Sequence, residues 1–323
     1  MIDWWSGPFG RATRRRLEQW SDWPPADADA LIVSFPKAGR TWLRVLLPAA
    51  LAVARGAPPD AELERWLASD RVQHAGKTVF FTHALASREA AGPADLRAFA
   101  RAWQRTPVLF VVRDPRDLVV SYFFQRTKRR QPAKDGRPVP PDLASFIRDP
   151  QFGAPRIIEV FNVWYRTLHR APEAMLLSYE ALHEEPAGAT RDAVRFLLGV
   201  EVPTEMARRA AEHASFDNMR ALELSDRFAV KKRLWARDKS DPDSFKTRKG
   251  RIGSFRDTLD AADIAYVDRV IEQSLAPELR YRTPGDAPPG FIRTGSASFG
   301  LRLARLWPRP RPAGAARQSS GGS

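Results

Sequence analysis

The chain has 323 residues, of which 43% are hydrophobic, so it can bury the core of one large domain or two small ones. It has no cysteine, which excludes disulfides and thiolate metal sites, and no run near the ~20 apolar residues of a transmembrane helix. The N-terminus lacks the apolar region of a signal peptide, so we expect a cytoplasmic protein. The net charge of +14 favours a partner with phosphate, sulfate or carboxylate groups.

The composition divides the chain into three predicted segments. Residues 1–23 are rich in Trp and Arg, residues 24–285 form a single domain, and residues 286–323 form a basic tail, rich in Pro, Gly and Ser, that we expect to be partly disordered. Both ends mix aromatic residues with arginines, as segments at a membrane interface do. Two interpretations stay open: the ends contact the inner face of a membrane peripherally, or they pack on the domain or on another chain.

Within the domain, short apolar runs alternate with helical patterns, which predicts an α/β fold with a parallel sheet flanked by helices. Four runs read as central strands: Leu31–Phe35, Thr78–His83, Val108–Arg113 and Met175–Tyr179. A chemically useful side chain lies at or just after the end of each run. Ligands of such sheets lie beyond the carboxyl ends of the strands, so we expect a site at this edge that includes Lys37, His83, Arg113 and Tyr179.

The first strand runs into a turn that can bind phosphate. Residues 35–42 read F-P-K-A-G-R-T-W, and such a turn directs backbone N–H groups and a helix N-terminus at an anion. Lys37 precedes Gly39, whereas the lysine of the common P-loop follows the second glycine. A helical pattern covers residues 42–55, and Pro48 inside it predicts a kink or an early end.

The third strand runs into a second candidate anion site. Arg113 ends the strand, and Ser121 lies eight residues further on, in the helix that follows. Asp114 suits the N-cap position and Asp117 the first turn of that helix, so we interpret both acids as helix-building residues. Later in the chain, Arg248-Lys249-Gly250-Arg251-Ile252-Gly253 combines cations with glycines that let the backbone approach a ligand closely.

These three segments, in this order, resemble the donor-binding elements of the PAPS-dependent sulfotransferases of the cytosolic type, where PAPS is 3′-phosphoadenosine-5′-phosphosulfate. The P-K-x-G turn is similar to their 5′-phosphosulfate loop, and the Arg-Ser pair and the R-K-G-x-x-G run are similar to their 3′-phosphate site. The family continues with Asp-Trp-Lys where this chain has Ser254-Phe255-Arg256. The resemblance covers about residues 31–257 and implies a P-loop-NTPase-like single domain, PAPS as donor, PAP as product and no metal.

The resemblance also implies which residues act. Donor binding would involve Lys37, Ala38, Gly39, Arg40, Thr41, Trp42, Arg113, Ser121, Tyr179, Phe216, Arg248, Lys249 and Gly250. Trp42, Tyr179 and Phe216 would lie near the adenine. Lys37 would stabilise the leaving phosphate, and Ser121 would hold that lysine away from the sulfate until an acceptor binds.

His83 is the candidate general base, because an imidazole can accept a hydroxyl proton near neutral pH. Phe81-Thr82-His83 resembles the Lys-Thr-His of the family, whose histidine is the base. Phe81 replaces a lysine that assists near the sulfuryl group in many members, so that assistance is missing or comes from another residue. We interpret the other histidines as surface or packing residues: His74, His169, His183 and His213.

The leading function is therefore transfer of a sulfuryl group from PAPS to a hydroxyl, or less readily to an amine. Two alternatives stay open: a nucleotide-dependent kinase and a non-catalytic polyanion-binding protein. Basic clusters at residues 126–137 and 227–239 favour an acidic acceptor, which could be a glycan or lipid-linked. No specific nucleic-acid partner is expected, and the acceptor and the oligomeric state stay open.

Overall fold

The computed structural model describes residue 18 and residues 23–86, 91–129, 138–169, 171, 173–229, 233–279, 281 and 291–293. The strands are β1 (Ala30–Ser34), β2 (Arg71–His74), β3 (Lys77–Thr82), β4 (Val108–Val112), β5 (Ala174–Ser178) and β6 (Phe291–Arg293). The α-helices are α2 (Arg40–Ala54), α3 (Leu63–Ala68), α4 (Pro93–Ala102), α5 (Pro115–Phe124), α6 (Leu143–Arg148), α7 (Ala154–Leu168), α8 (Tyr179–Glu184), α9 (Pro186–Leu198), α10 (Thr204–His213), α11 (Phe216–Ser225) and α12 (Ala261–Ser274). Shorter helical turns are η1 (Gln125–Arg129), η3 (Pro242–Ser244), η4 (Ser254–Asp257) and η5 (Pro277–Leu279).

The strands form one sheet in the order β2-β3-β1-β4-β5-β6. β1 pairs in parallel with β3 and β4, with Ile32 opposite Phe81 on one side and Leu109 on the other, and β4 pairs in parallel with β5. These are the four predicted strands, so the prediction of a mostly parallel α/β sheet is confirmed. β2 and β6 add antiparallel edges and are not predicted from the sequence.

The order of the strands creates a binding edge. The chain leaves β1 through α2 and returns in β3 on one side of β1, then crosses through α4 to β4 on the other side. The carboxyl ends of β1, β3 and β4 therefore meet at a topological switch point, which is where open parallel sheets bind their ligands.

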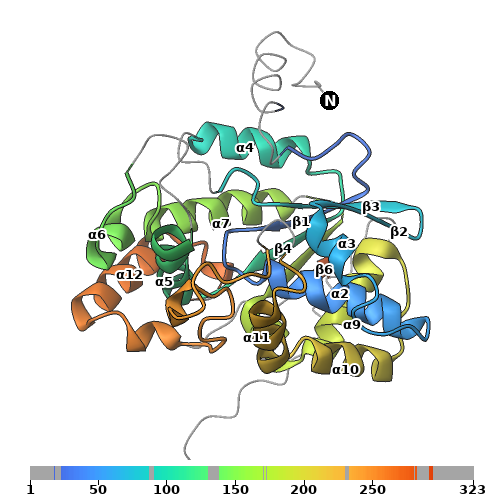
Figure 1. Ribbon diagram of the computed structural model, residues 1–323. Coiled ribbons are helices and arrows are strands. Elements are labelled where there is room, and N and C mark those ends of the chain that lie inside the picture. The colour runs from blue at the N-terminus through green and yellow to red at the C-terminus, as the bar shows by residue number, and fades with distance from the viewer. Residues whose placement is uncertain are drawn as a thin grey trace, which may run out of the picture.

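Helices cover both faces of the sheet. In Figure 1, α4 and α7 pack together on one face, and α2, α9 and α10 pack together on the other. Every residue of β1, β4 and β5 is buried as a consequence. This two-sided burial explains why these strands read as continuous apolar runs instead of alternating patterns.

Helix α2 runs from Arg40 to Ala54 and continues through Pro48, so the early end that the proline favours does not occur. A proline inside a helix costs about 3 kcal/mol. Every residue from Leu43 to Val53 is buried, and each large apolar side chain among them contributes about 1.5–3 kcal/mol on burial. Packing of the helix on the sheet therefore outweighs the local cost of the proline.

Two described parts of the terminal segments contact the domain. The ring of Trp23 lies 5.2 Å from that of Phe99 and 5.9 Å from that of Trp103, so this residue of the N-terminal segment packs on α4 and the turn after it. The strand β6 falls within the predicted tail and pairs with β5. Apart from Trp23 and Phe291, the aromatic residues of the two terminal segments lie outside the described residues. None of the helices in the described part of the chain is long and apolar enough to cross a membrane.

Candidate active site

A cavity of about 360 Å³ lies at the carboxyl edge of the central strands. Lys37 reaches it after β1, His83 after β3, Arg113 after β4 and Tyr179 after β5. Every residue predicted for the site lines this cavity except Ala38, which is fully buried. The structure thus brings the three candidate anion-binding segments and the candidate base to one place.

The turn after β1 adopts a conformation that depends on Gly39. This residue has φ 111° and is the N-cap of α2. A Cβ atom at this position would lie 3.1 Å from Cδ2 of Tyr179, so both the backbone and the close approach of the ring require glycine. The turn thereby directs the N-terminus of a long helix into the cavity, where the first N–H groups of the helix favour an anion.

Lys37 is a half-buried cation among other cations. Its Nζ donates a hydrogen bond of 3.4 Å to the carbonyl of Lys246. Burial, with smaller effects from Arg129, Arg113 and Arg248, lowers the pKa of Lys37 to about 7. In the absence of an anion the ammonium is therefore only partly populated at neutral pH, and bound phosphate would favour the charged form.

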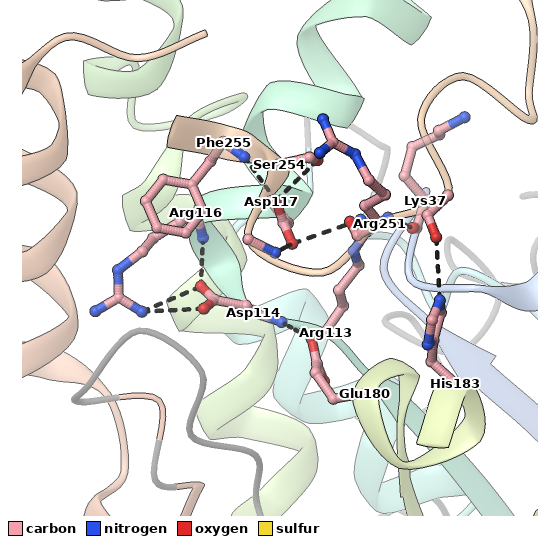
Figure 2. Close-up of polar contacts among 12 residues, drawn as sticks. Lys37, Arg113, Asp114, Arg116, Asp117, Glu180, His183, Arg251, Ser254 and Phe255 are labelled. Carbon is pink, nitrogen blue, oxygen red and sulfur yellow. Dashed lines mark hydrogen bonds and ion pairs between the residues drawn. The ribbon is translucent and has the colours of Figure 1, made fainter. Parts of the chain in front are cut away.

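Arg113 connects the separate parts of the site, as Figure 2 shows. Its guanidinium donates to the carbonyl of Lys37 at 3.5 Å and to that of Arg251 at 3.4 Å. It lies 3.6 Å from the carboxylate of Asp117 and stacks 4.2 Å from the centroid of the Tyr179 ring. Arg113 thus holds together the turn after β1, the basic loop (residues 248–253) and the start of α8.

Asp117 does more than favour the first turn of α5. Its carboxylate accepts hydrogen bonds from the backbone N–H of Gly253 at 2.7 Å and of Phe255 at 2.9 Å, and from the hydroxyl of Ser254 at 3.1 Å. It therefore anchors the basic loop to α5 (Figure 2). Asp114 is the N-cap, as predicted, and accepts from the N–H of Arg116 at 2.9 Å.

The basic loop also forms part of the cavity wall. Arg248 and Lys249 line it and form ion pairs with Asp243 at 3.4 Å and Asp257 at 3.0 Å. Gly250 has φ 62°, and a Cβ there would lie 2.2 Å from the ring of Phe216. The backbone of this loop therefore packs directly against an aromatic face, which only glycine allows.

Three flat side chains gather beside these cations. The Trp42 ring lies 5.6 Å from that of Tyr179 and 6.1 Å from that of His183. His183 lines the cavity, and its Nε2 lies 3.2 Å from the carbonyl of Gly250. His183 is exposed, in agreement with its interpretation as a surface or packing residue, and it also belongs to the wall of the site, which the sequence does not indicate. Flat apolar faces of this kind suit a purine base.

His83 is held in one tautomer. Its Nδ1 lies 2.9 Å from the carbonyl of Ser34, which can only accept, so Nδ1 carries the proton. Its Nε2 lies 2.6 Å from Nη2 of Arg40, which can only donate, so Nε2 is unprotonated. Burial, followed by the charge of Arg40, lowers the pKa of His83 well below its usual value. His83 is therefore a neutral imidazole at the cavity, and the lone pair of its Nε2 accepts a hydrogen bond from Arg40.

The comparisons with known proteins agree with this geometry. The family model of the sulfotransferase domain matches residues 27–277. The chain belongs to this family. The sequence-based assignment to the sulfotransferases is thereby confirmed, and with it the reaction class, transfer of a sulfuryl group.

Individual sulfotransferases are only distantly similar. Cytosolic sulfotransferase 7 of Arabidopsis thaliana is 22% identical over 77% of this chain and 79% of its own length, and mouse sulfotransferase 1A1 is 23% identical over 79% and 86%. A match to cytosolic sulfotransferase 12 of A. thaliana, at 22% identity, covers 51% of this chain and 49% of that protein. The crystal structure of mouse sulfotransferase SULT7A1 complexed with PAP has 18% identity and a TM-score of 0.53, covering 84% of this chain and 90% of that one, and supports the same fold.

This sulfotransferase also places residues in the site that motif analysis does not single out. Lys246 is a lining residue whose Nζ lies 3.4 Å from the hydroxyl of Thr41 in the first turn. Its only signal in the sequence is its place next to the R-K-G run. Ser121 lines the cavity as predicted, but Lys37 donates to the Lys246 carbonyl rather than to this hydroxyl. The role of Ser121 in restraining Lys37 stays a prediction.

Among the described residues of the sulfotransferase, no three histidine, aspartate or glutamate side chains cluster as a metal site would require. His74 and His169 do not line the cavity. His74 pairs with Glu62, and His169 stacks on Tyr165.

Proposed function

We propose that this protein transfers a sulfuryl group from PAPS to a hydroxyl acceptor, releasing PAP and a sulfated product. The observation that carries the proposal is the single cavity lined by Lys37, His83 and Arg113. Two groups of cations line this cavity: one belongs to the turn after β1, and the other consists of Arg113 and Arg248. The neutral imidazole of His83 lines the same cavity. That arrangement matches a donor with a phosphosulfate at one end and a 3′-phosphate at the other.

The charge of the cavity supports this donor. PAPS carries about four negative charges at neutral pH. The lining cations are Lys37, Arg40, Arg113, Lys246, Arg248 and Lys249, and no carboxylate lies among the described lining residues. We assign the 5′-phosphosulfate to the first turn, the 3′-phosphate to Arg113, Ser121 and the basic loop, and the adenine to the rings of Trp42, Tyr179 and Phe216.

The residues of the site then divide the chemistry. His83 Nε2 accepts the proton of the acceptor hydroxyl, and the electron pair of that oxygen forms the new bond to sulfur. The bond between sulfur and the bridging phosphate oxygen breaks, and its electrons stay on the 5′-phosphate of PAP. Lys37 stabilises the negative charge that develops there, because a fixed cation acts most strongly where charge appears in the transition state.

The acceptor is proposed to be a hydroxyl compound, with an amine as the lesser alternative. The structure weakens the argument from the basic clusters to an acidic acceptor, because five of their basic side chains form ion pairs within the protein: Lys128 with Asp241, Arg129 with Glu223, Arg227 with Asp60, Arg233 with Asp70 and Lys239 with Asp226. Glycan and lipid-linked acceptors stay within the proposal. So does a cytoplasmic location, because relatives named as cytosolic sulfotransferases match most of the chain.

The test is an acceptor screen with PAPS. Phenols, sterols, sugars and lipid headgroups are each incubated with enzyme and donor, and mass spectrometry detects a gain of about 80 Da with stoichiometric PAP. Parallel reactions with ATP and Mg²⁺ test the kinase alternative, and transfer of phosphate there would replace the proposal. Salt-sensitive binding of heparin or DNA without any PAPS binding would support the polyanion-binding alternative instead.

The affinity for PAP is expected to fall as the pH rises above about 7. Burial and neighbouring cations lower the pKa of Lys37 to about 7 in the free protein, and bound phosphate raises it again. Binding above that pH therefore takes up a proton, which weakens it by up to about tenfold per pH unit for each proton. Calorimetry in buffers of different ionisation enthalpy measures the uptake.

Matched variants assign that proton. Lys37→Met should remove its share of the uptake, while Lys246→Met tests the neighbouring lysine, whose pKa burial also lowers. An affinity that stays constant between neutral and alkaline pH in the unmodified protein would contradict the buried, partly neutral state of Lys37.

A further inference from the structure

The guanidinium of Arg40 lies where the reaction must take place. Its Nη2 is 2.6 Å from Nε2 of His83, the atom that accepts the acceptor proton in the proposed function. A base must come within hydrogen-bond reach of the hydroxyl it deprotonates. Arg40 therefore occupies the place of that hydroxyl, and any sulfuryl group in line with the hydroxyl lies beside the same guanidinium.

Other nearby cations are committed elsewhere. Arg44 donates to the carbonyls of Trp66 and Ser69, each at 2.6 Å, and to Asp70 at 2.5 Å. Arg233 binds both carboxylate oxygens of Asp70, at 2.9 and 2.8 Å. Neither arginine lines the cavity. Phe81, on the strand that leads to His83, is buried beneath Arg44 at 3.8 Å, so it brings no charge to the site.

Lys246 is another lining cation whose charge acts on His83, but its ammonium contacts a different residue. Its Nζ lies 3.4 Å from the hydroxyl of Thr41. Arg40 belongs to the first turn of α2, so its side chain starts next to the place assigned to the phosphosulfate and ends at the base. By changing rotamer, a long side chain that starts there can reach either Nε2 of His83 or the sulfuryl group of the donor.

We propose that Arg40 is a further catalytic residue, which covers Nε2 of His83 until the donor binds and then moves to the sulfuryl oxygens. The proposal rests on the proposed function. In the free protein the Arg40–His83 hydrogen bond keeps the base covered. With PAPS bound, the sulfuryl oxygens compete for the guanidinium, and its departure opens Nε2 to the acceptor hydroxyl.

The transfer step then has a defined role for Arg40. The acceptor proton goes to His83 Nε2, the acceptor oxygen forms its bond to sulfur, and the sulfur–oxygen bond to phosphate breaks with its electrons on PAP. Arg40 donates to the non-bridging sulfuryl oxygens throughout and is itself unchanged. Bidentate bonds from a guanidinium to such oxygens are strong and directional.

The first test compares two ligands that differ only in the sulfuryl group. In the absence of acceptor, Arg40→Gln should weaken PAPS binding by about 10- to 100-fold, the range for a hydrogen bond to a charged group, and change PAP binding by no more than about twofold. Arg40→Lys should lie between. Arg55→Gln removes an exposed arginine from the other end of α2 and controls for net charge.

The second test reads the covered base directly. Nitrogen NMR of labelled histidine should show His83 in the Nδ1–H tautomer with a low pKa, and Arg40→Gln should raise that pKa. The other charges that act on this ring are Asp70 and Lys246. Adding PAPS should shift the Nε2 resonance of the unmodified protein, whereas adding PAP should not.

The outcomes separate the two proposals. Equal loss of PAP and PAPS affinity in Arg40→Gln, or loss of the PAPS preference in Lys246→Met instead, overturns the role of Arg40. An unchanged His83 pKa in Arg40→Gln does the same. If the unmodified protein binds neither nucleotide, the proposed function fails, while the NMR of the free protein still tests the contact with His83.

Discussion

Asparagine in place of His83 is expected to lower kcat for sulfuryl transfer by about 10²–10⁴-fold, the usual contribution of a positioned base. His83 Nδ1 donates to the Ser34 carbonyl at 2.9 Å, which directs Nε2 to the cavity. An asparagine amide can keep that donor but has no group able to accept a proton near neutral pH. The affinity for PAP should change little, because the proposed function places the histidine against the acceptor and not against the nucleotide.

The measurement is steady-state transfer from PAPS alongside PAP binding by calorimetry. His169→Asn is the matched control, because this histidine stacks on Tyr165 away from the cavity. Its kcat should equal that of the unmodified protein. A His83 variant that retains full kcat, or that loses rate only through weaker PAP binding, would exclude His83 as the base.

Methionine in place of Lys37 is expected to lower kcat by about 10²–10³-fold, the typical effect of removing one preorganised group at a developing charge. Lys37 Nζ donates to the Lys246 carbonyl at the wall of the cavity, and a methionine side chain brings no charge to the leaving phosphate. PAP affinity should also fall, since the product carries that phosphate. Replacing Lys37 with arginine should restore only part of the rate, because a planar guanidinium places its donors differently from a compact ammonium.

The free protein should respond in the opposite direction. Lys37 lies among Arg129, Arg113 and Arg248, whose charges oppose its own, so methionine at this position should raise the temperature of thermal unfolding without nucleotide. The increase in unfolding temperature on adding PAP should become smaller. Lys77→Met, at the exposed start of β3, is the control. Lower stability of the free Lys37→Met protein would contradict the interpretation that Lys37 destabilises the free protein and serves its function.

Much of the fold follows from local patterns. Strands β1, β4 and β5 are largely apolar runs because helices cover both faces of the sheet, and that burial is visible in the residues themselves. The edge strands β2 and β6 have only four and three residues, too few to give a period that separates strand from loop. Pro48 misleads in the other direction, because its local cost is smaller than the burial of the helix around it.

The candidate site divides in the same way. The first turn, the Arg113 strand end and the R-K-G run are each contiguous, so their residue types and spacing already indicate anion binding. Lys37, His83, Arg113 and Tyr179 gather around one cavity because each follows a strand of the same sheet. The contacts of Asp117 could not be predicted from local patterns, because its partners Gly253, Ser254 and Phe255 lie 136 to 138 residues away in the sequence.

By itself, the sequence determined the sulfotransferase family, the mostly parallel sheet and the chemistry of the strand ends, because those depend on consecutive residues. The tertiary structure alone decided that Arg40 covers His83, that Lys246 and His183 face the cavity, and that burial leaves Lys37 partly neutral. These features depend on which side chains of distant segments meet, and on how much water their packing excludes. Neither quantity has a local pattern in the chain.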